Sequence, residues 1–178
     1  MSYNGLNSKE LQLVELLVSW GTKIKFVEAL VGDAKAVLTA RKLYKSRGVR
    51  PPNGMPGSAV ATNASLPTYQ SYIALSGTFF QLRETGAETH EAMISVYAFH
   101  MKVTHETIRT VNVNNWFSLA RDLEVGNAGL YRCRACGGGH LWQFGVYRMH
   151  RRCMWCAAKI QMPDTAIAAA TDQTALMT

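Results

Sequence analysis

The sequence contains no long apolar run. A membrane-spanning helix needs about 18 or more consecutive apolar residues, and no such stretch occurs. The opening residues, MSYNGLNSKE, are polar and include no apolar segment of the kind found in secretory signals. We therefore expect a cytoplasmic protein with no membrane association, in which thiols stay reduced.

Common catalytic and nucleotide-binding motifs are also missing. The sequence has no phosphate-binding P-loop, no dinucleotide fingerprint and no G-x-S-x-G elbow. The zinc-protease pattern H-E-x-x-H fails at both of its partial matches, because Ile94 replaces the second histidine in one and Arg109 replaces it in the other. We therefore expect a protein that is not an enzyme.

Acidic residues are absent from residues 125–162, which carry six basic residues. A second basic block, residues 23–50, has eight basic residues against two acidic ones. Clustered positive charge of this kind is typical of proteins that bind a polyanion. A solvated basic surface gives the same composition, so the charge pattern favours nucleic acid without requiring it.

Apolar residues near the N-terminus recur at the spacing of one helix. One face carries Leu13, Leu16, Leu17, Trp20, Ile24 and Val27. The opposite face carries Leu11, Val14 and Val18. A helix that is apolar on two faces is buried twice, within a core or against a partner chain. Gly32-Asp33 then predicts a turn followed by a helix N-cap.

The segment after this turn predicts a basic helix over about 34–47. Its packing side consists of Ala36, Val37, Ala40, Leu43 and Tyr44. Its other side presents Lys35, Thr39, Lys42 and Ser46, with Lys45 beside them. A helix, a short turn and a basic amphipathic helix form the pattern of a helix-turn-helix, whose second helix enters the DNA major groove. We place this helix-turn-helix-like segment at about 22–47; a plain surface helix is the alternative.

Proline is concentrated in one segment, because residues 48–67 hold four of the five prolines. This segment predicts a linker or an extended loop. Three further helices are expected at about 68–85, 88–104 and 112–125. Their aromatic and methionine residues favour a core or a subunit interface over a cofactor pocket.

The chain has four cysteines, which form two C-x2-C pairs: Cys133 with Cys136, and Cys153 with Cys156. Two such pairs supply four thiolates to one tetrahedral zinc ion. Gly137-Gly138-Gly139, directly after the first pair, suits the sharp turn of such a site. We therefore predict one structural Zn²⁺ per chain, with no open coordination position for catalysis.

Other uses of these thiols fit the sequence less well. A redox C-x2-C stands once, at the start of a helix in a βαβ unit, and disulfides are not expected in a reducing compartment. A 2Fe–2S cluster also takes four thiolates, and the spacing does not exclude it. His140 and His150 are interpreted as surface or outer residues of the site, since four thiolates complete the metal shell.

The predicted fold class is mainly α, with a helix-turn-helix-like segment and a C-terminal, four-cysteine module resembling a zinc ribbon. A helical domain is expected over residues 1–127 and the zinc-binding module over residues 128–162. Residues 163–178 are expected to form a flexible tail.

Residues 43–58, LYKSRGVRPPNGMPGS, together with C-R-A-C-G-G-G and the final C-M-W-C, resemble the FlhC family. FlhC is a subunit of the flagellar master transcriptional activator of bacteria. The order of parts also agrees over roughly residues 10–160. The segment after Cys156 is less basic than is common in the family, with Lys159 as its one base.

This resemblance implies a role in bacterial flagellum biogenesis. FlhC proteins assemble with FlhD into a heterohexamer that binds upstream of flagellar operons and activates transcription with σ70 RNA polymerase. The chain would then be a DNA-binding subunit, with a FlhD-type subunit, promoter DNA and RNA polymerase as partners. The resemblance also assigns zinc to Cys133, Cys136, Cys153 and Cys156, and subunit contacts to the N-terminal helix and the aromatic middle.

Candidate DNA-binding residues come from both basic blocks. They are Lys35, Thr39, Lys42, Lys45, Arg47, Arg50, Arg132, Arg134, Arg148, Arg151 and Arg152. Most are expected to contact phosphate, and a minority bases. Two alternatives stay open: a zinc-stabilised protein-interaction scaffold whose partner subunit contacts DNA, and RNA binding by a zinc ribbon.

Overall fold

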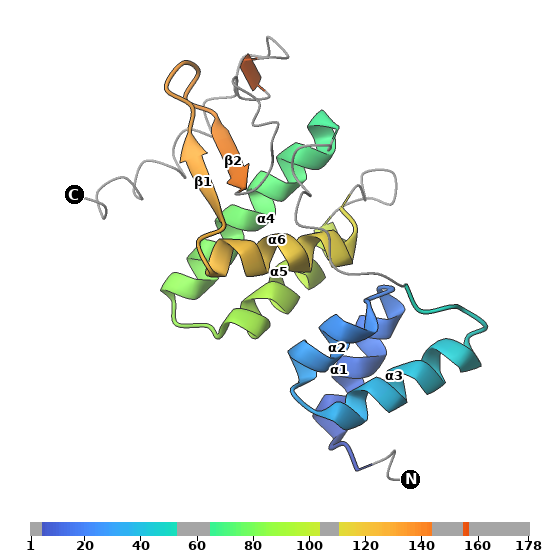
Figure 1. The fold of residues 1–178 in the computed structure, drawn as a ribbon. Coiled ribbons are helices and arrows are strands. Elements are labelled where there is room, and N and C mark those ends of the chain that lie inside the picture. The colour runs from blue at the N-terminus through green and yellow to red at the C-terminus, as the bar shows by residue number, and fades with distance from the viewer. Residues whose placement is uncertain (1–4, 53–64, 104–110, 144–154, 157–178) are drawn as a thin grey trace. The chain divides into compact units, whose positions relative to one another are not determined.

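The computed structural model describes residues 5–52, 65–103, 111–143 and 155–156. These residues form six α-helices and one two-stranded antiparallel sheet (Figure 1), so the prediction of a mainly α protein is confirmed. None of the helices in this part of the chain is long and apolar enough to cross a membrane. The chain divides into two compact units: Met1–Pro56 with Asn112–Phe117, and Gly57–Val111 with Ser118–Thr178.

Three helices form the body of the first unit: α1 (Ser8–Ser19), α2 (Ile24–Val31) and α3 (Ala34–Ser46). Each of them contacts the other two. Their buried apolar residues are Leu6, Val14, Leu17, Val18, Phe26, Val27, Leu30, Ala36, Ala40 and Tyr44. Burying a large apolar side chain stabilises a fold by about 1.5–3 kcal/mol, so this shared core is what holds three short helices together.

The prediction of one continuous N-terminal helix is wrong, because the chain breaks between α1 and α2. Gly21 has φ +74°, a left-handed conformation that glycine adopts without strain. The amides of Gly21 and Thr22 donate back to the carbonyls of Val18 and Leu17, each at 3.1 Å. This Schellman arrangement ends a helix. Gly21, which follows Trp20 in the sequence, is the residue from which the end of α1 could have been predicted.

The core face of α1 also differs from the prediction. Leu16, which we placed on the main apolar stripe, is 39% exposed. The fully buried residues of this helix are Leu17, from the same predicted stripe, and Val14, from the opposite face. Since the stripe was drawn through the break at Gly21, it followed a helix direction that the chain does not keep.

The turn between α2 and α3 has the structure that the sequence predicts. Gly32 lies in the left-handed region with φ +75°, and its amide donates to the carbonyl of Glu28. The Asp33 side chain then accepts a hydrogen bond from the Lys35 amide at 2.7 Å. An N-cap of this kind stabilises a helix by about 1 kcal/mol, so the start of α3 is fixed locally.

The second unit contains α4 (Leu66–Glu84), α5 (Thr89–Val103), the later part of α6 (Val113–Glu124) and a hairpin of β1 (Ala128–Arg132) and β2 (Gly139–Gln143). The predicted helices at about 68–85, 88–104 and 112–125 are confirmed, with ends shifted by one or two residues. Both strands contact α4, and Figure 1 shows the hairpin in orange beside this green helix. The hairpin is thus part of a larger unit.

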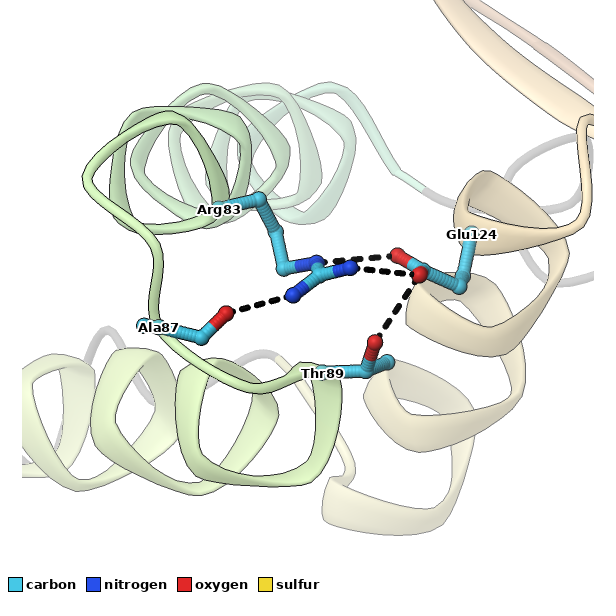
Figure 2. A network of polar contacts seen from close by, with 4 residues as sticks. All are labelled: Arg83, Ala87, Thr89 and Glu124. Atoms are coloured by element: carbon cyan, nitrogen blue, oxygen red, sulfur yellow. Dashed lines mark hydrogen bonds and ion pairs between the residues drawn. The ribbon is translucent and has the colours of Figure 1, made fainter.

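A polar network joins three helix ends in this unit (Figure 2). Arg83 at the end of α4 donates from Nε and Nη2 to the two carboxylate oxygens of Glu124 on α6, at 3.2 and 2.8 Å. The Thr89 hydroxyl, at the start of α5, donates to Glu124 at 2.8 Å. Arg83 also donates to the carbonyl of Ala87. The network therefore fixes the end of α6 shortly before β1 begins.

Replacing Glu124 with glutamine is expected to destabilise the protein in a pH-dependent way. The Arg83 hydrogen bonds, with help from Thr89, hold the pKa of Glu124 below its usual value of 4.5. A carboxyl with a lowered folded pKa stabilises the fold above its unfolded pKa and loses that effect as pH falls through the folded pKa. Glu124→Gln should lower the free energy of unfolding by up to about 1 kcal/mol near neutral pH.

The measurement is urea unfolding at neutral pH and again well below the usual glutamate pKa. The difference between the two proteins should shrink at the lower pH, because wild-type Glu124 is then protonated. Glu15→Gln, at an exposed position of α1, serves as the matched control and should show neither effect. A pH-independent deficit in Glu124→Gln would contradict the assignment.

Candidate metal centre and basic surfaces

The hairpin loop brings the first cysteine pair into a tight turn. Strands β1 and β2 pair from Ala128 with Gln143 to Arg132 with Gly139, so residues 133–138 form the connection. The Cys133 amide donates to the Gly138 carbonyl at 2.9 Å, and the Gly137 amide donates to the Cys133 carbonyl at 2.8 Å. Gly137 has φ +70°, which a residue with a Cβ rarely adopts. Glycine directly after Cys136 therefore allows this turn.

Three thiols converge at the end of the hairpin. The Sγ atoms of Cys133, Cys136 and Cys156 all lie within 4.8 Å of one another. The Sγ atoms of Cys133 and Cys156 are 3.7 Å apart, far longer than a disulfide bond of about 2.05 Å. Tetrahedral zinc with Zn–S bonds of about 2.3 Å separates its sulfurs by about 3.8 Å. The three thiols could therefore hold a metal ion, and the separation of the Cys133 and Cys156 sulfurs is close to this value.

Thiolate ligands are soft donors that suit zinc or an iron–sulfur cluster. All three thiols are half-buried, so an ion between them is partly shielded from water. Cys153, the fourth predicted ligand, lies outside the described residues, as does His150. The clustering that the spacing predicted is confirmed for Cys133, Cys136 and Cys156.

Trp155 fixes the position of Cys156, and sequence reasoning missed this role. The Trp155 indole N–H donates to the Gly139 carbonyl at 2.9 Å, and the side chain is buried. Cys156 is the next residue in the chain, so this bond holds its thiol near the hairpin loop. The tryptophan inside the C-M-W-C motif was the available signal, since a buried indole needs an acceptor for its N–H.

Tyr69 of α4 contacts β2, the strand whose Gly139 carbonyl accepts the hydrogen bond from Trp155. Its hydroxyl accepts a hydrogen bond from the Leu141 amide at 2.8 Å and lies 3.0 Å from Nδ1 of His140. Gly139 approaches α4 so closely that an added Cβ would stand 2.9 Å from Cγ2 of Ile73. The outer edge of β2 therefore meets a tyrosine and a tryptophan in place of a third strand, which satisfies backbone groups that an open edge would expose.

The other end of the hairpin is attached to α6. The side-chain Nε2 of Gln143 donates to Oδ2 of Asp122 at 2.6 Å, and both residues are buried. Arg121 lies 3.2 Å from Oδ1 of the same carboxylate. A hydrogen bond to a carboxylate is stronger than a neutral one. Residues 128–143, which we predicted to begin a separate zinc module, therefore lie in one unit with α4 and the end of α6.

The first basic block is exposed on and after α3. Its exposed cations there are Lys35, Arg41, Lys42, Lys45, Arg47 and Arg50, and Lys25 of α2 is exposed as well. Arg41 was missing from our predicted DNA-binding residues, although its exposure and charge match those of its neighbours. Six exposed cations of the block thus lie on α3 and in the residues that follow it, with the exposed Leu38 among them.

The placement of Thr39 on this exposed surface is wrong. Thr39 is 1% exposed, and its hydroxyl donates to the Lys35 carbonyl at 3.1 Å. It lies next to Ala36 and Ala40 on the helix surface, so it turns toward the core with them. A threonine that bonds to its own helix needs no outside partner.

Cations of the second block are only partly described. Arg134 is exposed in the hairpin loop, and Arg132 at the end of β1 is half-buried. Arg148, Arg151 and Arg152 lie outside the described residues. The described cations of this block thus lie beside the thiol cluster.

Comparison of the chain with protein-family models and with curated proteins finds no match. The resemblance to the FlhC family therefore stays a prediction that rests on residues 43–58 and the cysteine motifs.

Cys136→Ser should remove the metal ion and loosen the hairpin. Loss of one thiolate leaves an incomplete shell, and a structural metal contributes much of the folding free energy of its site. Elemental analysis should fall from about one metal ion per chain to a small fraction of that value, and hydrogen exchange should rise at β1 and β2. Ala135→Ser, an exposed position in the same loop, is the matched control. Full metal retention in Cys136→Ser would contradict the site.

Trp155→Phe should weaken metal binding while leaving all four thiols in place. Phenylalanine keeps an aromatic ring but lacks the N–H that bonds to Gly139, so Cys156 is held less firmly. Loss of a residue that positions a metal ligand typically lowers metal affinity about 10-fold or more. We therefore expect roughly a 10-fold loss in metal affinity, measured by competition with a chelator. Trp20→Phe in the first unit should have no effect. Equal affinities in Trp155→Phe and wild type would remove Trp155 from this role.

Proposed function

We propose that this chain is a metal-stabilised, DNA-binding subunit of a heteromeric transcription activator. The observation that carries the proposal is the exposed basic surface of α3. This helix contains four basic residues and no acidic residue, and all four basic side chains are exposed. A helix of this charge is an electrostatic match for the phosphates of DNA.

The surroundings of α3 support a helix-turn-helix role. α2 packs against α3, and only Gly32 and Asp33 separate the two helices. α1 packs on both, which leaves the basic side of α3 to solvent. In proteins of this architecture the second helix enters the major groove, and its cations bind phosphates beside it. Lys35, Lys42 and Lys45 are the residues we assign to this contact.

The thiol cluster supports a second, structural part of the proposal. Cys133, Cys136 and Cys156, completed by Cys153, would hold one Zn²⁺ in a closed shell. Such an ion keeps a shape and performs no chemistry. Arg132 and Arg134 flank the first knuckle, so the metal would hold these cations at fixed positions beside nucleic acid.

The partners follow from the likeness to FlhC. We propose a cytoplasmic heterohexamer with a FlhD-type subunit, which acts at flagellar promoters with σ70 RNA polymerase. An exposed apolar pair supports a protein partner: Phe99 and Val103, one turn apart on α5, are 62% and 61% exposed. The same pair supports the alternative function, a protein-interaction scaffold whose partner subunit contacts DNA.

Charge reversal on α3 tests the proposal against this alternative. Lys42→Glu with Lys45→Glu should weaken binding to promoter DNA and reduce the slope of log K against log salt by about 2, because each phosphate contact adds about 1. Fluorescence anisotropy over a salt series measures both. Lys9→Glu with Lys102→Glu, at exposed positions on other helices, is the matched control. Unchanged affinity and slope would favour the scaffold.

A further inference from the structure

We propose that the outward face of the hairpin, formed by Tyr131 and Trp142, is a stacking surface for an unstacked DNA base. The inference rests on the proposed DNA-binding function and extends it. Basic helices bind phosphates and the edges of paired bases. An aromatic surface instead binds the flat face of a base that has left the helical stack.

The strand register places both rings on one side of the ribbon. Tyr131 pairs with His140, and Trp142 pairs with Gly129. Alternation then puts Leu130 and Leu141 on the opposite side, where Leu141 is buried at 5% exposure. Tyr131 is 55% exposed, which is unusual for a large aromatic ring in a small ribbon. The hairpin thus has an inner face with Leu130 and Leu141 and an outer face with Tyr131 and the half-buried Trp142. His140, which lies beside Tyr69 of α4, shares the outer face.

Gly129 determines how the tyrosine ring lies. A Cβ at this position would stand 2.9 to 3.1 Å from Cε2, the hydroxyl oxygen and Cζ of Tyr131. The ring therefore lies over the glycine backbone, where a larger residue would displace it. The glycine backbone thus limits the positions that the ring can take, while the residue stays 55% exposed. Such a ring is already oriented for stacking and loses little freedom on binding.

Trp142 completes the surface. The centroids of the Tyr131 and Trp142 rings are 6.4 Å apart, and their planes meet at 80°. Two nearly perpendicular rings form a corner, in which one ring stacks on a base while the other meets its edge. A hydrocarbon ligand would not require this geometry, whereas a planar heterocycle uses both rings.

Positive charge beside the Tyr131 and Trp142 rings favours a polyanionic ligand. Residues 125–143 contain no carboxylate and two cations, of which Arg132 is half-buried and alternates to the inner face of the ribbon with Leu130. Arg134 is exposed in the loop that follows β1, on the same ribbon as the two rings. Exposed aromatic rings beside a cation are the combination that binds single-stranded nucleic acid through stacking and phosphate attraction. Duplex DNA offers such a base only where it is kinked or melted.

The test compares DNA probes that share one sequence: a perfect duplex, a duplex with a short unpaired bubble, and a single strand. The full chain is used with its metal, in the assembly in which it purifies. Wild type should bind the bubble more tightly than the duplex. Tyr131→Ala should lose about 5- to 100-fold in affinity for the bubble, in line with one base–aromatic stack, and much less for the duplex. Tyr131→Phe should keep the preference, because stacking needs the ring and not the hydroxyl.

Val125→Ala, an exposed apolar residue between α6 and β1 with no assigned role, is the control variant, and metal content verifies the fold of each variant. A second measurement uses wild type alone: photocrosslinking to 5-iodouracil in the bubble should label Tyr131 or Trp142. Equal binding of duplex and bubble, or crosslinks only elsewhere, would overturn the inference and leave the proposed function standing. Failure to bind any probe would overturn both. Loss of the partner subunit in Tyr131→Ala, with DNA affinity unchanged, would make this face a protein interface and also overturn the inference.

Discussion

A two-stranded hairpin is too small to be stable alone in water, and this constraint shapes the second unit of the protein. The ribbon of β1 and β2 is held at its loop by converging thiols, along its outer edge by Tyr69 and Trp155, and at its far end by the bond from Gln143 to Asp122. Each attachment leads to another element of the unit. The thiol cluster therefore belongs to the same unit as these helices.

These attachments connect local chemistry to the proposed function. Trp155 brings Cys156 to the loop cysteines, and Tyr69 ties the same strand to α4. A bound ion would then stiffen the ribbon from one end, while the Arg83 and Glu124 network fixes the helix that leads into it. In the proposed function, stiffness of this kind would keep cations and exposed rings at set positions and would lower the entropy lost on binding DNA. The basic surface of α3 depends on separate interactions, those of its three-helix core.

Local signals in the sequence were sufficient for much of this architecture. Gly32 and Asp33 correctly marked the end of α2 and the start of α3, because a left-handed glycine and an N-cap act within one turn. The C-x2-C spacing likewise predicted the meeting of Cys133, Cys136 and Cys156. Predictions from helical spacing were wrong at two places. The chain breaks at Gly21, so the residues assigned to one helix belong to two. Thr39, predicted to be exposed, is buried and donates a hydrogen bond to its own helix. The contacts of Tyr69 and Trp155 were beyond sequence reasoning, since they join residues 72 and 16 positions apart.

X-ray absorption at the zinc edge, recorded on the purified full chain, tests the central claim most directly. The account predicts about one zinc ion per chain, surrounded by four sulfur atoms at about 2.3 Å. A shell with fewer sulfurs and added nitrogen or oxygen ligands would contradict the closed thiolate site. A metal-free protein whose hairpin amides remain protected from exchange would contradict the claim that the ion holds this ribbon in place.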